Sequence, residues 1–480
     1  MTSVQLSHAR LPGHDRLVDL AIADGAIVDP ASLPADAERV DLDGRWVIPG
    51  LWDHHVHFTQ WAIVRRRLDL SGARSAQAAA HTVAARLHAE MAALEPLIGF
   101  GYRDAMWDDE ATFELLDAVA PTRPVVLLSG DLHACWVNTA ARDRYGLSEA
   151  GVVREDEAFA LQMRLEKATA EDELAAVSEA AFAAASRGIV GIVDLEMGGN
   201  LANWTERMTR GLRALRVRSG FYPAELDERI GAGWRTGDMV PGTDDMLTIG
   251  PLKIITDGSL NTRTAYCHDT YTGLDTRGVL TVAPELCETL LERAHAHGFR
   301  VAVHAIGDAA VTHALDAFAA TGARGTIEHA QLVRDMDLAR FGELGVVASI
   351  QPEHLWDDRD ATERIWPDRA HRAFPFGALR DAGAALVLGS DAPVARLDPW
   401  RAIAAAVTRT ADAREAWHPE HALTRRQALA ASSPHSHLTP GSPGDLVVLE
   451  ADPLTCSTAE LEHMPVAATL AAGAFTHRRL

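Results

Sequence analysis

A helix, a glycine and a short apolar strand follow one another repeatedly in the second half of the chain, and this repeat limits the fold most strongly. The strands that follow the glycines comprise residues 189–195, 300–304, 326–329, 346–351 and 384–390. Glycine is suited to the end of a helix because it adopts the left-handed backbone conformation at little steric cost. Apolar strands that alternate with helices indicate a parallel sheet covered by helices.

Three more apolar segments, 47–51, 215–221 and 249–256, raise the number of such strands to about eight, the number in a (β/α)8 barrel. We therefore predict an α/β fold with a TIM-like (β/α)8 barrel. The strand at 125–128 would then lie in an insertion after the first barrel strand. A doubly wound sheet is the alternative, but no Gly-x-Gly-x-x-Gly motif follows an early strand to support it.

Short strands also occupy both ends of the chain. Residues 17–23 alternate in polarity, Asp24-Gly25 offers a hairpin turn, and residues 26–28 return. Residues 446–450 and 466–475 have strand character near the other end. We predict that the two ends pair into a small β-sandwich, with the barrel inserted between them. The expected domains are 1–48 and 434–480 for the sandwich and 49–433 for the barrel, with an insertion at about 60–170.

The charge balance and the cysteines limit the partners and the compartment. The 480 residues carry a formal net charge of -22, which argues against binding to nucleic acid or to anionic lipid. Four cysteines are scattered without paired spacing, as is typical of a reducing compartment: Cys135, Cys267, Cys287 and Cys456. Residues 1–16 are polar, and no stretch is long and apolar enough to span a membrane. We expect a cytoplasmic protein with a small-molecule substrate, and the sequence leaves a homo-oligomer open.

Metal-binding residue types gather where the predicted barrel strands end. The active site of such a barrel lies at the C-terminal ends of its strands. There the sequence places His55, His57, His304, His329 and Asp391. On a strand His55 and His57 point to one face and His54 to the other. Each residue alone has an ordinary explanation, such as a core histidine or a helix N-cap, but the five together predict a divalent metal site, with zinc favoured.

Lys253 lies on the predicted strand at 249–256 and is the unusual member of this group. Burial lowers the pKa of a lysine, and the neutral amine can add carbon dioxide to form a carbamate. The carbamate is anionic and has two oxygens, so it could bridge two metal ions. The alternative is a lysine paired with Asp257 or another carboxylate.

These motifs resemble those of the amidohydrolase superfamily. The resemblance rests on residues 49–57, the single histidines at 304 and 329, Gly389-Ser390-Asp391-Ala392-Pro393, and their order along one barrel with Lys253. More narrowly the chain is similar to the amidohydrolase 3 branch, which contains N-substituted formamide deformylase-like hydrolases. That similarity rests on Gly101-Tyr102 with Trp107-Asp108, on residues 131–138, 151–155, 257–260 and 263–265, and on Gln351-Pro352 with His354.

The resemblance covers nearly the whole chain and implies the barrel, the split sandwich and a centre with one or two metal ions. By this resemblance His55 and His57 would hold a first metal ion near Asp391, and His304 and His329 a second. Carboxylated Lys253 would bridge the two ions, and Asp391 would be the catalytic proton carrier. A single-metal site stays open.

The implied function is a metal-dependent hydrolase that cleaves a non-peptide C–N bond through a metal-activated hydroxide. An N-substituted amide or formamide is the expected substrate, and a deaminase or cyclic-amide hydrolase on the same metal site is the alternative. A catalytically inactive scaffold is a remote alternative, because the metal ligands are all present. Candidate substrate-binding residues, for which loop packing is an equal explanation, are Trp107, Asp131, His133, Trp136, Arg263, His268 and His354.

Overall fold

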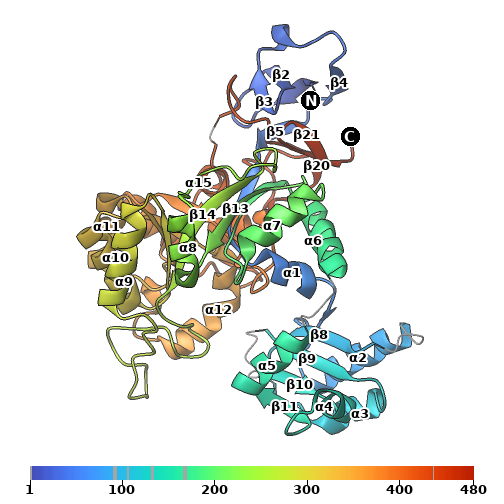
Figure 1. Cartoon of the computed structure of the whole chain (residues 1–480), viewed down its shortest axis with the longest axis vertical. Helices are drawn as coiled ribbons and strands as arrows, with labels where there is room; N and C mark the ends of the chain where they lie inside the picture. Colours follow the sequence, from blue (N-terminus) through green and yellow to red (C-terminus); the bar gives the residue numbers. More distant parts are fainter. Residues whose placement is uncertain (1–2, 90–94, 105–106, 131–133, 166–169, 436) are drawn as a thin grey trace. The chain divides into compact units, whose positions relative to one another are not determined.

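The computed structural model describes the chain except residues 1–2, 90–94, 105–106, 131–133, 166–169 and 436 (Figure 1). The chain divides into two compact units. The barrel unit comprises Met1–Phe58 and Ala181–Leu480, and the inserted unit comprises Thr59–Ala180. Among the described residues, no helix is long and apolar enough to cross a membrane. The domain boundaries expected from the sequence stay a prediction.

The barrel is an eight-stranded parallel sheet within the described residues. Its strands are β6 (Leu51–Val56), β12 (Ile189–Asp194), β13 (Arg216–Phe221), β14 (Leu247–Ile255), β15 (Val301–Ala305), β16 (Gly325–His329), β17 (Val347–Ile350) and β18 (Leu386–Leu388). The first and last strands meet just beyond β18, where the amide of Asp391 donates to the carbonyl of His55 at 2.7 Å. A parallel bridge between Val56 and Ala392 extends this contact, so the barrel is nearly closed. The predicted α/β barrel is confirmed.

Helices follow the barrel strands and cover them on the outside. They include α7 (Asn200–Thr209), α8 (Leu226–Gly231), α9 (Pro284–Ala296), α10 (Asp308–Thr321), α11 (Asp335–Leu344), α12 (Pro352–Ile365), α13 (Phe376–Asp381), α14 (Pro399–Thr408) and α15 (Arg425–Ala431). Figure 1 shows α9, α10 and α11 side by side along this outer layer. The glycines that the sequence placed between helix and strand all have positive φ: Gly188 (90°), Gly298 (80°), Gly322 (64°), Gly345 (65°) and Gly383 (91°).

The first barrel strand begins later than expected, because the run at 46–51 belongs to two different sheets. Residues of β5 (Trp46–Pro49) pair with β19 (Leu446–Leu449), away from the barrel. Gly50 marks the change: a Cβ there would overlap Val190 of the neighbouring barrel strand. The predicted first strand at 47–51 is therefore wrong, and β6 takes its place. An unbroken apolar run gives no sign that the chain passes from one sheet to the next.

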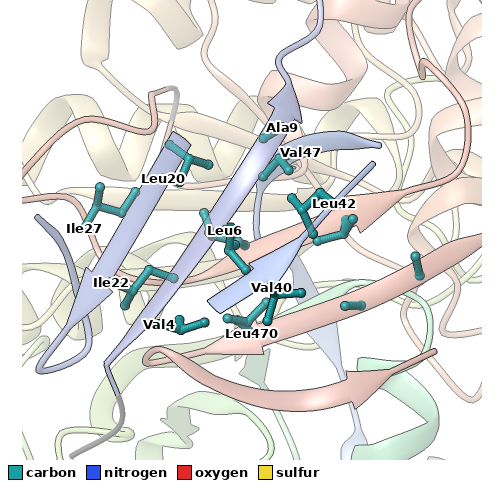
Figure 2. Close-up of a cluster of buried hydrophobic side chains, with 14 residues drawn as sticks. Val4, Leu6, Ala9, Leu20, Ile22, Ile27, Val40, Leu42, Val47 and Leu470 are labelled. Carbon is teal, nitrogen blue, oxygen red and sulfur yellow. The ribbon is translucent and has the colours of Figure 1, made fainter. Parts of the chain in front are cut away.

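Both ends of the chain build one mixed sheet of eight strands within the described residues. Besides β5 and β19 it contains β1 (Val4–Arg10), β2 (Leu17–Ala23), β3 (Ala26–Val28), β4 (Glu38–Asp41), β20 (Val466–Ala471) and β21 (Ala474–Arg478). Figure 2 shows Leu6, Ile22 and Val47 gathered with Leu470 in a buried apolar cluster. The segment expected as one strand at 466–475 is instead a hairpin that turns at Gly473.

The inserted unit has its own sheet and core. Its strands are β7 (Leu68–Asp69), β8 (Leu97–Tyr102), β9 (Val125–Ser129), β10 (Ala134–Val137) and β11 (Gly151–Arg154), and its helices include α2 (Ala76–Ala89), α3 (Phe113–Val119) and α4 (Thr139–Tyr145). The strand predicted at 125–128 corresponds to β9. A buried cluster that contains Tyr102, Leu127 and Trp136 packs between the sheet and its helices.

Candidate metal centre

Strand β6 carries the first histidines, and it does so through an irregular register. Asp53 pairs with Ile192 and Val56 with Asp194, so β6 has one more residue than β12 between these pairs. Such a bulge breaks the alternation of side chains. The carboxylate of Glu328 bonds Nδ1 of His55, and its charge also acts on His54, where it opposes the larger effect of burial on the pKa.

His55 is oriented by a buried carboxylate. Its Nδ1 lies 2.8 Å from Oε2 of Glu328, and both side chains are almost fully buried. A carboxylate only accepts, so Nδ1 carries the proton and Nε2 keeps a lone pair. That Nε2 lies 3.4 Å from Oδ1 of Asp391 and 3.4 Å from Nζ of Lys253. A histidine whose second nitrogen is fixed by a carboxylate is the usual arrangement around a protein-bound metal ion.

Two groups of ligand atoms share Asp391. In the first group, nitrogens of His55 and His57 and an oxygen of Asp391 lie within 4.8 Å of one another, and His57 Nε2 is 3.5 Å from Asp391 Oδ1. The second group joins His329 and His354 to Asp391 within the same limit, with His354 Nε2 3.8 Å from Oδ2. One carboxylate between two pairs of imidazoles could serve one or two metal ions.

Two of these residues, His329 and Asp391, have left-handed backbone conformations, which direct their side chains towards the ligand group. His329 has a φ of 71° and Asp391 a φ of 58°. On a regular strand Glu328 and His329 would point to opposite faces, yet Glu328 bonds His55 and the His329 ring lies 5.1 Å from the His55 ring. Non-glycine residues hold this conformation at a cost, and such strain is concentrated at functional sites.

Lys253 projects from β14 into the same group and is 2% exposed. Burial lowers the pKa of Lys253, although the charges of Glu328 and Asp391 oppose that shift. In the described part of the chain it forms no ion pair with Asp257, which instead accepts hydrogen bonds from backbone amides, including that of Gly307 at 2.8 Å. The pairing of Lys253 with Asp257, one of the alternatives considered from the sequence, is therefore not present, whereas the charges of Glu328 and Asp391 do act on Lys253.

His304 lies beside the second group, but its ring nitrogen is directed elsewhere. Its ring is 4.5 Å from that of His329, measured between centroids. Its Nε2 lies 3.4 Å from Oδ1 of Asp257 and 3.3 Å from the carbonyl oxygen of Gly258. His304 thus lies beside His329 with its Nε2 turned towards Asp257 and Gly258, and its role as a metal ligand stays a prediction.

Burial sets the protonation states of the site. It lowers the pKa of His57 to about 3, and it holds the pKa values of His55 and His329 well below the usual range. Burial also raises the pKa of Asp391 to about 7, although the charge of Lys253 acts in the opposite direction. The imidazoles are therefore neutral at pH 7, which is the form that binds metal ions.

The residues present fit a divalent cation. Neutral imidazoles and a carboxylate are the ligand types that zinc and related ions take. The Nδ1 atoms of His57 and His329 are buried and have no hydrogen-bond partner within the described residues. Buried polar atoms in proteins nearly always have a partner, so such atoms beside a ligand cluster are consistent with a bound group.

The substrate-binding candidates of the barrel unit have different surroundings. His354 lies among the ligand atoms themselves rather than at a rim. Arg263 is exposed. His268 is half-buried, with its Nε2 3.1 Å from the hydroxyl of Thr312 and 3.0 Å from Nη1 of Arg334, so it is engaged in contacts within the protein.

The candidates of the inserted unit include two tryptophans that belong to its core. Trp136 is fully buried, and Trp107 packs on it with ring centroids 6.3 Å apart. Both indole nitrogens donate to backbone carbonyl oxygens. These contacts favour the packing explanation for both residues. Asp131 and His133 lie outside the described residues.

Sequence reasoning missed two polar residues that support the ligands. Glu328 fixes His55 through Nδ1. Asp53 accepts from the amides of His55 and Ser390, each at 3.0 Å, and so ties β6 to the residues after β18. A charged residue inside an apolar strand was the available signal for Glu328.

The sequence pattern of the amidohydrolase family matches residues 38–477, nearly the whole chain. The chain belongs to the amidohydrolase family. The superfamily resemblance read from the sequence is therefore confirmed, and this amidohydrolase is a hydrolase of a metal-dependent family.

Individual relatives of this amidohydrolase are distant. It is 27% identical to the protein LONG AFTER FAR-RED 3 of Arabidopsis thaliana, over 86% of this chain and 79% of that protein. It is 24% identical to an N-substituted formamide deformylase of Arthrobacter pascens, over 92% and 90%. An uncharacterised metal-dependent hydrolase from Pyrococcus horikoshii OT3 has a similar structure, with a TM-score of 0.80 and 26% identity over 95% of this chain and 99% of that chain.

Proposed function

We propose that this amidohydrolase cleaves the C–N bond of an N-substituted amide or formamide. The observation that carries the proposal is the convergence of buried, neutral imidazoles on one buried carboxylate, Asp391. The similarity to an N-substituted formamide deformylase supports the choice of substrate class. Fold alone does not determine the reaction, so the substrate requires its own test.

We assign the metal ligands by the geometry of the two groups. His55 and His57 would hold one ion with Asp391, and His329 and His354, or His304 after a ring rotation, would complete the site. A divalent ion bound there would lower the pKa of a coordinated water molecule and polarise the scissile carbonyl group. Lys253 is placed to supply two further oxygens as a carbamate, because its amine is buried beside His55 Nε2.

Asp391 would carry the proton. Its raised pKa of about 7 suits a group that must both accept and donate a proton near neutral pH. The attacking water gives one proton to the carboxylate as its oxygen bonds to the carbonyl carbon. The C–N bond then breaks, and the proton passes from Asp391 to the leaving nitrogen, so that the products are a carboxylic acid and an amine.

A substrate screen tests the proposal. The protein, supplied with zinc and bicarbonate, is incubated with N-substituted formamides, N-substituted acetamides, cyclic amides and aminated heterocycles. Equal amounts of formate and amine from the formamides, or of acetate and amine from the acetamides, would support the proposal. Release of ammonia, or opening of a cyclic amide with no turnover of the open-chain amides, would contradict it.

A further inference from the structure

Arg218, in the barrel unit, has no acidic partner among the described residues, although the chain has a net charge of -22. The Arg218 side chain projects from β13 and is half-buried. Within the described residues its guanidinium forms neither a hydrogen bond nor an ion pair, and its Cζ lies 4.3 Å from the centroid of the Trp52 ring. By contrast, Arg216 on the same strand pairs with Asp445 at 2.7 Å.

A second positive charge makes this position more unusual. Burial and, next, the charge of Arg300 both lower the pKa of Arg218. The charge of Arg300, which is itself exposed, thus adds to the cost of holding the Arg218 guanidinium without a carboxylate partner. In a chain with 67 acidic residues and 45 lysines and arginines, an arginine that finds no acid indicates a place for a negative ligand.

Two further polar atoms beside Arg218 are also unsatisfied. Nε1 of Trp52 and Nε2 of His54 are buried and have no hydrogen-bond partner in the part of the chain that the structure describes. The two rings lie 6.2 Å apart. The indole N–H can only donate, so it requires an acceptor that the protein does not supply.

The sequence accommodates this arrangement with a glycine. A Cβ at Gly191 of β12 would overlap the indole of Trp52, so the ring can lie across β12 and contact Arg218 only because residue 191 has no side chain. Trp52 and Arg218 stand early in their strands, whereas His57 and Asp391 come after theirs. Trp52 and Arg218 therefore lie nearer the N-terminal ends of their strands than His57 and Asp391 do, and His54 lies between them and the candidate ligand His55 along the chain.

We propose that Arg218, Trp52 and His54 form a binding site for a small oxyanion. The guanidinium presents parallel N–H donors that match two oxygens of a phosphate, sulfate, bicarbonate or carboxylate group. The Trp52 indole supplies one more donor and a flat wall, and Arg300 adds charge. This site is independent of the proposed amide hydrolysis.

Calorimetric titration of the metal-loaded protein with inorganic phosphate at constant ionic strength tests the proposal. Wild type should bind one phosphate more per chain than Arg218→Gln, or bind it about tenfold more tightly. Arg210→Gln, which removes an exposed arginine paired only with Glu206, should behave as wild type. A parallel titration with acetate separates a tetrahedral from a planar preference.

Phosphate that reaches the metal centre would appear equally in all variants and so cancels from the comparison. Trp52→Phe keeps the ring under Arg218 and removes only the N–H donor, and it should weaken binding several-fold. If Arg218→Gln does not fold, phosphate binding by Trp52→Phe tests the proposal in its place. Identical phosphate and acetate titrations for wild type and these variants would show that Arg218 only packs against Trp52, and would overturn the proposal.

Discussion

Two regions are rich in aromatic and polar side chains: the candidate metal centre of the barrel unit and the core of the inserted unit. They differ in whether their buried polar atoms have hydrogen-bond partners. In the inserted unit Asn138 is fully buried, and its amide makes four hydrogen bonds to backbone groups, each at 2.8–3.0 Å. In the barrel, His57 and His329 have buried nitrogens without partners, and Asp391 is a buried carboxylate with a raised pKa. Satisfied polar groups stabilise a fold, whereas unsatisfied polar groups that cluster with a carboxylate of raised pKa are typical of a ligand-binding or catalytic site.

Removing the charge of Asp391 should give the largest effect. Asp391→Asn should lower kcat/KM by about 10³-fold, because the proton carrier is lost. In the metal-free protein the same variant should unfold at equal or higher denaturant concentration, since a buried carboxylate with a pKa of about 7 is destabilising at pH 8. Steady-state kinetics and urea titration measure the two quantities.

The matched control for that variant is Asp244→Asn. Asp244 is exposed and shares the left-handed backbone of Asp391, with a φ of 53°, so asparagine tests the chemistry without a backbone penalty. Its activity should stay within about twofold of wild type. A near-normal rate for Asp391→Asn would show that the carboxylate is not the proton carrier.

Truncation of Trp136 should lower the stability of the protein and leave metal binding unchanged. Trp136→Ala should cost about 3–5 kcal/mol of stability, because it empties a fully buried site and removes the hydrogen bond to the Thr112 carbonyl. Limited proteolysis should then cut first within 59–180, while the metal content per chain stays that of wild type. If Trp136→Ala lost metal but resisted the protease as wild type does, Trp136 would not have the purely structural role that distinguishes the inserted unit from the candidate metal centre.

The pH dependence of stability should identify the neutral histidines. Burial lowers the pKa of His54 to about 3, so this histidine contributes stability above pH 6.5 that is lost as the pH falls towards 3. Between pH 7.5 and 5.0 the unfolding free energy of the metal-free protein should fall about 2 kcal/mol less in His54→Asn than in wild type. Equal falls, measured by urea titration, would mean that His54 is not held neutral.

The smallest effect is expected at Trp107. Trp107→Phe keeps the aromatic ring against Trp136 and removes the hydrogen bond to the carbonyl of Ala73, so it should cost about 1 kcal/mol. Thermal unfolding measures the change. Activity on any substrate found in the screen should be unaltered. A several-fold rise in KM would restore the substrate-binding role considered from the sequence.

The barrel and most of its candidate ligands could be predicted from the sequence because they depend on local rules. A glycine with positive φ after each helix, followed by an apolar strand, places His304 and His329 at strand ends without knowledge of the fold. His55 and His57 were found from their His-x-His spacing after the apolar run at 46–51. The order of these residues along the chain was enough to recognise the family.

The features of the fold and of the candidate site that could not be predicted depend on departures from those local rules. The bulge in β6 interrupts the alternation of its side chains, and the left-handed backbone of His329 lets Glu328 and His329 approach the same imidazole, that of His55. His354 joins the ligand group from the start of α12, where a sequence pattern indicates only a helix. The core roles of Trp107 and Trp136 depend on contacts between segments far apart in the chain, which periodicity does not reveal.

The imidazoles of the barrel that converge on Asp391 are proposed to bind a divalent metal ion. The most direct test is metal content per chain by inductively coupled plasma mass spectrometry, on protein prepared without chelator and with bicarbonate. Wild type and the control His295→Ala, which changes an exposed histidine of α9, should carry about one or two zinc-like ions. The double variant His55→Ala/His57→Ala should carry fewer by at least one. Wild-type protein that holds no metal and takes up none on reconstitution would contradict the account.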